Sequence, residues 1–159
     1  MGETELDHLS SGRIRFEPPS ARWNTVWRDA YQRYAAALAV PVDDAIATTV
    51  WSWLLAGTHG LEALLALDGE RLAGFAHFRP FPRTLNGNEA GYLDDLWVAE
   101  SHRGKGLGRA LIEQVCAIGR ERGWTEVRWV SERGNEAHRL YERIATNWGL
   151  LTYRIPLSR

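Results

Sequence analysis

The feature that most constrains this chain is a glycine-rich loop that joins a strand to a helix. Residues 92–98 (YLDDLWV) read as a strand, and residues 107–122 repeat apolar side chains at helical spacing. Between them lies the segment 103–108, Arg-Gly-Lys-Gly-Leu-Gly. Glycines let successive backbone N–H groups turn toward one point, and the positive end of the helix dipole adds to the potential there. The loop therefore predicts an anion site, most naturally for a phosphate or pyrophosphate group.

Two common phosphate-binding patterns do not fit this loop. In the P-loop of nucleoside triphosphatases a Ser or Thr follows Gly-Lys, whereas here Gly106 follows Lys105. In dinucleotide-binding folds the pattern is Gly-x-Gly-x-x-Gly, and here the third glycine, Gly108, comes one residue early. A glycine-rich surface connection with solvated charges is the simpler alternative to an anion site.

The composition is that of a soluble globular protein. The 159 residues are 45% hydrophobic and 25% charged, with a net charge of −1, which disfavours both a disordered chain and a nucleic-acid-binding protein. The single cysteine, Cys116, excludes an internal disulfide and a zinc site with two or more cysteine ligands. No apolar stretch reaches the roughly 18 residues that span a bilayer, and the polar, acidic residues 1–10 do not resemble a signal peptide. We expect a cytoplasmic protein that binds no metal, no nucleic acid and no membrane.

Hydrophobic periodicity and turn residues predict the order of the elements. The predicted elements are a strand over 13–17, helices over 24–38 and 41–56, strands over 61–67, 72–78 and 92–98, a helix over 107–122, a strand over 126–130, a helix over 135–145 and a strand over 150–155. Asp68-Gly69 predicts a hairpin turn, and Pro80 and Pro82, together with the polar stretch 84–88, predict a loop. The order β-αα-ββ-β-α-β-α-β is an α+β, or mixed α/β, pattern. We expect one domain over 13–159 after a loose leader over 1–12.

Two segments of the chain together resemble one family. The residues Arg103-Gly104-Lys105-Gly106-Leu107-Gly108 resemble the R/Q-x-x-G-x-G/A signature of the GNAT acetyltransferase superfamily. The preceding LDDLWV resembles that family's fourth strand, and NEAHRLYER, at 135–143, resembles its later helix with a Leu-Tyr or Phe-Tyr pair. Two motifs in the right order, separated by a helix and a strand, are more specific than either alone. The Trp-rich N-terminal half and the LDDLWV strand are most similar to the branch that contains the yeast histone-and-polyamine acetyltransferases.

The resemblance implies acetyl coenzyme A as the acetyl donor. Its pyrophosphate would bind the backbone N–H groups of the glycine loop, and its pantetheine arm would pair with the strand like an added strand. The implied fold is a mostly antiparallel sheet, flanked by helices, that splays open between the strands at 92–98 and 126–130. The implied cofactor-binding residues are Leu96, Trp97, Val98, Arg103, Gly104, Lys105, Gly106, Leu107, Gly108, Arg109 and Asn135. Asn135 stands one residue after the position at which many relatives carry their asparagine, which is Gly134 here.

The chemistry requires a base, because an alkyl ammonium group has a pKa of about 10.4 and is not nucleophilic at neutral pH. Asp94 matches the family's acidic residue four positions before the final valine of the strand, and Asp95 is a candidate to hold the cationic substrate. Strict alternation places the two on opposite faces, and a bulge would change that phase. Tyr141 matches the family's tyrosine, which can protonate the departing thiolate. The structural alternatives are carboxylates paired with arginines and a tyrosine that only packs.

The function predicted from these residues is an N-acetyltransferase. It would transfer an acetyl group from acetyl-CoA to a primary amine by direct attack, with a general base and then a tyrosine general acid. The alternative is a non-catalytic module of the same fold that binds acetyl-CoA. Acidic residues and tryptophans suit a cationic acceptor, either a small amine or a lysine-like side chain. The apolar segment 148–157 predicts a homodimer.

Overall fold

The structure, a computed structural model, describes residues 14–157. The predicted leader over 1–12 lies outside the described residues. The chain divides into two compact units, of which the first ends at Trp129 and the second begins at Val130. A single domain over 13–159 stays a prediction. Within residues 14–157 no helix is long and apolar enough to cross a bilayer.

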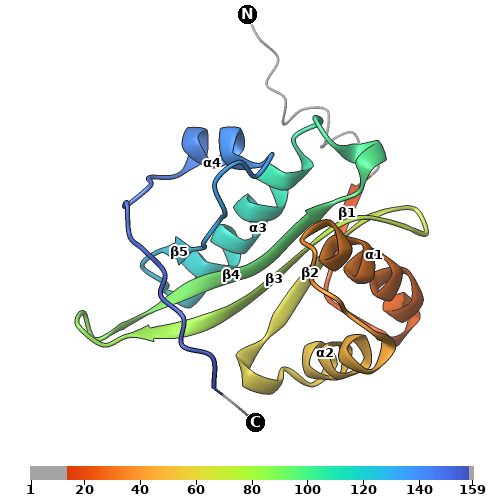
Figure 1. Ribbon diagram of the computed structural model, residues 1–159, viewed down its shortest axis with the longest axis horizontal. Coiled ribbons are helices and arrows are strands. Elements are labelled where there is room, and N and C mark those ends of the chain that lie inside the picture. Colours follow the sequence, from red (N-terminus) through yellow and green to blue (C-terminus); the bar gives the residue numbers. More distant parts are fainter. Residues whose placement is uncertain (1–13, 158–159) are drawn as a thin grey trace, which may run out of the picture. The chain divides into compact units, whose positions relative to one another are not determined.

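The first unit is built on a mixed sheet of five strands in the order β1-β2-β3-β4-β5 (Figure 1). The strands are β1 (Ile14–Glu17), β2 (Glu62–Asp68), β3 (Arg71–Arg83), β4 (Asn88–Val98) and β5 (Val127–Arg128). Neighbouring strands from β1 to β4 are antiparallel, and β5 runs parallel to β4. The prediction of an α+β fold with a mostly antiparallel sheet is therefore confirmed.

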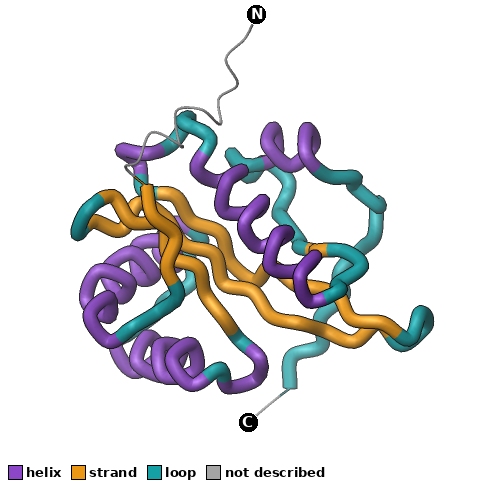
Figure 2. The backbone as a smooth tube through the Cα atoms, turned by 180° about the vertical axis from the view of Figure 1, so that it is seen from behind, coloured by secondary structure: helices purple, strands orange, loops and turns teal. Residues whose placement is uncertain are grey.

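Helices cover both faces of this sheet. Helices α1 (Asn24–Ala37) and α2 (Asp44–Ala56) lie together on one side, and α3 (Leu107–Arg122) lies on the other (Figures 1 and 2). Successive side chains of a strand point to opposite faces of the sheet, so each strand contributes residues to the packing against the helices on both sides. Phe75 belongs to the cluster formed with α1 and α2, whereas a Cβ on its neighbour Gly74 would lie 3.1 Å from Leu111 of α3.

The core between the sheet and α1–α2 is aromatic. Trp23, Trp27 and Trp51 are at most 4% exposed and pack with Leu65, Leu67 and Phe75. The ring of Trp27 lies 4.7 Å from Tyr31 and 4.8 Å from Trp51. These three tryptophans are therefore packing residues of the core.

Helix boundaries follow the capping residues. The carboxylate of Asp43 accepts a hydrogen bond of 2.8 Å from the N–H of Ile46, so α2 begins at Asp44 and not at the predicted Pro41. Helix α3 spans the predicted range and ends at Gly123, whose φ of 78° is the left-handed conformation that glycine adopts at low cost. The same conformation at Gly57 ends α2.

The loop predicted from Pro80 and Pro82 is wrong, because both prolines lie inside β3. Strand β2 pairs with β3 only as far as Phe78, so the following residues of β3 have β4 as their sole strand neighbour among the described residues. A proline lacks the N–H that an inner strand donates, but it is tolerated at such an edge. The turn between β3 and β4 is therefore confined to residues 84–87.

The second unit contains α4 (His138–Ile144), which is shorter than the predicted helix over 135–145. The strand predicted over 150–155 is wrong, because these residues form no strand in the structure. Apolar side chains of this segment are exposed, including Leu150, Tyr153 and Ile155 at 72%, 85% and 84%. A strand needs a hydrogen-bonded neighbour, and the described part of the chain supplies none here. The homodimer stays a prediction.

Candidate functional site

A β-bulge in β4 brings the two predicted carboxylates to one place. His77 of β3 pairs with Asp95, but Phe78 pairs with Leu93, so Asp94 has no partner on β3. One extra residue in a strand shifts the alternation of side chains by one position. Both Asp94 and Asp95 therefore line the same cavity, instead of facing opposite sides of the sheet.

This cavity has a volume of about 250 Å³. It lies between α1, α2 and the strands β3 and β4, and it contains two carboxylates, a guanidinium group and two imidazoles among apolar and aromatic side chains. The lining residues are Tyr31, Val50, Trp53, His59, Leu61, His77, Arg79, Asp94 and Asp95. We call it the acidic cavity. All of its residues belong to the first unit.

Asp95 is held by two side chains. The hydroxyl of Tyr34 donates to its Oδ1 over 2.9 Å, and Nδ1 of His77 lies 2.9 Å from its Oδ2. Burial raises the pKa of Asp95, but the interactions with His77 and Tyr34 outweigh burial and leave the pKa below its ordinary value. Asp95 is therefore a stable anion at neutral pH.

Asp94 differs from its neighbour in both partner and pKa. Nε of Arg79 lies 3.2 Å and 3.0 Å from its two carboxylate oxygens. Burial raises the pKa of Asp94 above its ordinary value, and the charge and hydrogen bond of Arg79 only partly offset this effect. Asp94 is thus the stronger base of two adjacent carboxylates whose pKa values move in opposite directions.

The glycine loop has the conformation that the sequence predicts. Gly104 and Gly106 have φ angles of 71° and 81°, and Gly106 is the N-cap of α3 with no side-chain hydrogen bond to the helix. The N–H of Ala110 bonds to the carbonyl of Gly106, which leaves the N–H groups of the first turn, residues 107–109, without an intrahelical acceptor. A helix N-terminus of this kind fits an anion.

The charged side chains of this loop are turned toward protein groups. Nε of Arg103 donates to the carbonyl of Val98 over 3.1 Å, and Nζ of Lys105 donates to the carbonyl of Ser101 over 2.9 Å. Arg109 forms an ion pair of 2.7 Å with Glu113, one turn later in α3. All three charged side chains therefore already have partners within the protein.

Next to the loop, one edge of strand β4 has no strand neighbour among the described residues. Strand β5 pairs with β4 only at Gly91 and Tyr92, and it is shorter than the predicted strand over 126–130. From residue 93 onward, no strand of the described chain pairs with β4 on the β5 side. The predicted pantetheine-binding residues Leu96, Trp97 and Val98 lie on this part of the strand.

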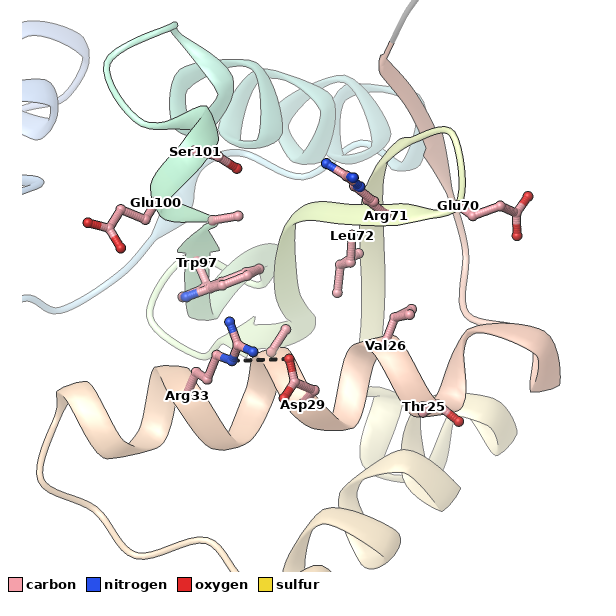
Figure 3. A pocket seen from close by; sticks show the side chains of 12 residues that line it. Thr25, Val26, Asp29, Arg33, Glu70, Arg71, Leu72, Trp97, Glu100 and Ser101 are labelled. Carbon is pink, nitrogen blue, oxygen red and sulfur yellow. Dashed lines mark ion pairs between the residues drawn. The ribbon is translucent and has the colours of Figure 1, made fainter.

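A larger groove of about 970 Å³ lies beside α1 at the end of β4 (Figure 3). Trp97 and Leu72 form part of its wall, and Asp29 pairs with Arg33 of the same helix over 3.1 Å. Neither Asp94 nor Asp95 lines this groove. Chemistry that uses the two carboxylates belongs to the smaller, acidic cavity.

Tyr141 and Asn135 belong to the second unit. Burial raises the pKa of Tyr141, so its hydroxyl keeps its proton at neutral pH. Asn135 accepts a hydrogen bond of 2.9 Å from the N–H of Ala137 through Oδ1. The roles predicted for both residues stay predictions.

Sequence reasoning did not predict Arg79 or His77 as a site residue, although both line the acidic cavity. The register of the β3–β4 hairpin would have identified Arg79. With β3 and β4 paired up to the turn at 84–87, Arg79 lies opposite Tyr92, close to the two aspartates. Because a loop was predicted at Pro80, the pairing of this part of β3 could not be derived.

Comparisons with known proteins agree on one class. The Acetyltransferase (GNAT) family matches residues 22–145. A D-amino-acid N-acetyltransferase of Saccharomyces cerevisiae is 33% identical over 161 residues, which cover 97% of this chain and 98% of the relative. A glucosamine 6-phosphate N-acetyltransferase of Trypanosoma brucei brucei is 33% identical over 75 residues, 46% of this chain and 50% of the relative.

Solved structures extend this similarity to the fold. The crystal structure of a ribosomal-protein-alanine N-acetyltransferase from Brucella melitensis has a TM-score of 0.77 and 28% identity, covering 91% of this chain and 99% of that one. The chain therefore belongs to the GNAT family of acetyltransferases. It is an acetyl-CoA-dependent N-acetyltransferase whose acceptor is an amine.

Proposed function

We propose that this enzyme acetylates the α-amino group of a small amino acid in the acidic cavity. One observation carries the proposal: the cavity holds two carboxylates and a guanidinium group side by side, Asp94, Asp95 and Arg79. An ammonium group suits the carboxylates, and a substrate carboxylate suits the planar fork of an arginine. A volume of about 250 Å³ is below the range of about 300–1,000 Å³ that is typical of drug-sized ligands. The name of the yeast relative, a D-amino-acid N-acetyltransferase, supports the same acceptor class.

The two carboxylates have different roles in this proposal. Asp95, with its lowered pKa, holds the incoming ammonium group. Asp94, with its raised pKa, takes the proton directly or through a water molecule, and the neutral amine then attacks the thioester carbon. Adjacent acids whose environments move their pKa values apart are typical of a pair with separate roles.

Acetyl-CoA supplies the activated acetyl group, and residues of this chain would hold it. The backbone N–H groups of residues 104–109 fit its pyrophosphate, because the positive φ angles of Gly104 and Gly106 orient the loop at the N-terminus of α3. The free edge of β4 at Leu96, Trp97 and Val98 fits the amide groups of the pantetheine arm. Asn135 is a further candidate contact, and Tyr141 would give a proton to the departing thiolate.

The glycine loop gives a direct binding test. Gly106→Val replaces a left-handed residue with one that disfavours this conformation, so the backbone N–H groups lose their common direction. We expect the Kd for acetyl-CoA, measured by calorimetry, to rise about 100-fold, the loss of two charge-assisted hydrogen bonds. Gly123→Val is the matched control, because Gly123 has a similar φ of 78° at the other end of α3. Equal affinities for the two folded variants would contradict the phosphate site.

The carboxylate roles predict different kinetic changes. Asp94→Asn removes the base, so kcat is expected to fall about 10²–10⁴-fold with little change in the KM for the amine. Asp95→Asn removes the anion that holds the ammonium group, so the KM for the amine is expected to rise more than kcat falls. Asp29→Asn, which changes an exposed carboxylate outside the acidic cavity, is expected to leave both parameters unchanged.

The pH profile of the same variants tests the base. Because the pKa of Asp94 is raised, its carboxylate takes up a proton at a higher pH than an ordinary aspartate, and kcat falls as the pH decreases through that value. Asp95 remains ionised in this range, because its pKa is lowered. We expect the acidic limb of the kcat profile to disappear in Asp94→Asn. An acidic limb that persists there and disappears in Asp95→Asn would reverse the two roles.

Arg79 predicts the acceptor class. Arg79→Gln is expected to raise the KM for D-alanine by about tenfold or more, the loss of one ion-paired hydrogen bond, and to change the KM for ethylamine, which lacks the carboxylate, much less. Loss of Arg79 also changes the basicity of Asp94, but this change affects both acceptors alike. The increase in KM for D-alanine relative to the increase for ethylamine therefore measures the contact between Arg79 and the substrate carboxylate. Arg83→Gln on the same strand, where Arg83 pairs with Glu126, is the control. Equal effects of Arg79→Gln on both acceptors would favour a plain amine substrate.

Tyr141→Phe tests the proton donor. The substitution keeps the ring and removes only the hydroxyl, so kcat is expected to fall about 10²–10⁴-fold while the KM for acetyl-CoA changes little. Tyr153→Phe, at a tyrosine that is 85% exposed in the same unit, controls for the loss of a phenol. Turnover of Tyr141→Phe within about threefold of wild type would leave Tyr141 as a packing residue.

A further inference from the structure

A buried chain of hydrogen bonds runs from α1 through β3 to β4 and back to α1. Nε1 of Trp27 donates to Nε2 of His77 over 3.0 Å, and Nδ1 of His77 lies 2.9 Å from Oδ2 of Asp95. The hydroxyl of Tyr34 closes the chain by donating to Oδ1 of Asp95 over 2.9 Å. Trp27 is fully buried and His77 is 1% exposed, so water cannot readily replace these partners.

The chemistry of the indole decides where the proton of His77 resides. An indole N–H can only donate a hydrogen bond, so Nε2 of His77 must accept one and carries no proton. In a neutral imidazole the proton then lies on Nδ1, the nitrogen that faces Asp95. Trp27 thus fixes the tautomer of His77 and turns its single N–H toward the carboxylate.

The surroundings of the ring keep it in this position. The imidazole of His77 stacks on Phe75 with ring centroids 4.6 Å apart and an angle of 19° between the planes. The ring of Tyr31 meets its edge with centroids 5.5 Å apart. A ring held on its face and at both nitrogens cannot turn without breaking the hydrogen bond to Trp27 or the one to Asp95.

We infer that His77 is a positioning residue for the acceptor amine: it acts as a fixed neutral donor that, together with Tyr34, holds the carboxylate of Asp95 ionised and oriented in the acidic cavity. This inference rests on the proposed role of Asp95 toward the ammonium group. The donors occupy one lone pair on each oxygen of Asp95, and a carboxylate oxygen can accept a further bond. Asp95 therefore keeps acceptor capacity for the substrate while its own orientation is set by β3 and α1.

Two amide variants separate this role from simple core packing. In His77→Asn the side-chain amide lies near the former Nδ1 and can donate to Asp95, but it does not reach Trp27. In His77→Gln the amide extends to the former Nε2 and can accept from Trp27, but Oδ2 of Asp95 loses its donor and only the donor from Tyr34 to Oδ1 remains. Each variant keeps one hydrogen bond of the chain, so their thermal stabilities are expected to be similar.

The kinetic expectation is asymmetric. The KM for the amine is expected to remain within about threefold of wild type in His77→Asn and to rise about tenfold in His77→Gln, the loss of one hydrogen bond to a charged group. The KM for acetyl-CoA is expected to be unchanged in both variants. An equal rise in the KM for the amine in both variants, in proportion to their loss of thermal stability, would overturn the inference. A histidine that only packs in the core would not be more sensitive to loss of the hydrogen bond at Nδ1 than at Nε2.

A spectroscopic measurement on the unmodified enzyme tests the tautomer directly. In ¹⁵N NMR at neutral pH, His77 is expected to show a protonated Nδ1 and an unprotonated Nε2. A proton on Nε2 would overturn the inference without any reference to the acceptor.

Asp95→Asn, assayed with the same amine, distinguishes failure of the inference from failure of the proposed function. An unchanged KM in Asp95→Asn contradicts the proposed role of Asp95 and with it the step that depends on it. A raised KM in Asp95→Asn, together with a wild-type KM in His77→Gln, overturns the role of His77 alone.

Discussion

The bulge at Asp94 is the constraint on which the site depends. In a regular antiparallel pair, adjacent residues point to opposite faces of the sheet, so two consecutive aspartates could not share a cavity. The register shift between His77 and Phe78 makes Asp94 the extra residue and places both carboxylates in the acidic cavity. The same shift leaves Asp95 directly opposite His77, which allows the hydrogen bond of 2.9 Å between them.

The electrostatics of the pair follow from the elements that surround it. Asp95 lies against α1, and α1 supplies Tyr34 directly and Trp27 through His77. Asp94 lies toward the exposed end of β3, where Arg79 is its partner and 38% of the arginine side chain is exposed. A single partner in contact with water offsets the cost of burial less than two donors do when one of them, His77, is buried. The pKa values of the two aspartates therefore shift in opposite directions because Asp95 has donors from α1 and β3, whereas Asp94 has only the partly exposed Arg79.

Much of this arrangement could be predicted from the sequence, because its signals are local. Glycines at 104 and 106 specify positive φ angles, and the apolar repeat from Leu107 specifies α3. The hairpin at Asp68-Gly69 likewise depends on two adjacent residues. The family resemblance rests on the same local segments, and the fold that it implies is the one observed.

The remaining features depend on pairing between distant segments. The bulge is fixed by the register of β3 against β4, which the sequence of β4 alone does not specify. Proline by itself favours a loop at position 80. Strand β2 begins only at Glu62, which pairs with Phe78, so β3 beyond Phe78 has no neighbour on the β2 side and tolerates Pro80 there. The sequence around His77 does not indicate its hydrogen bonds, because its partners, Trp27 and Asp95, lie 50 and 18 residues away.

In the proposed function, strand β4 contributes its side chains to the acceptor site and its backbone to the donor site. Its bulge directs two carboxylates into the acidic cavity between α1, α2 and β3, whereas on its β5 side no strand of the described residues pairs with it after Tyr92. From Asp94 to Val98 the strand spans about 13 Å, at about 3.3 Å per residue. The glycine loop begins soon after this edge ends, so in the proposed binding mode its N–H groups at the start of α3 would hold the phosphates of the donor. A donor that also pairs along the edge would then have its acetyl end next to the carboxylates, because the strand connects the loop to the acidic cavity.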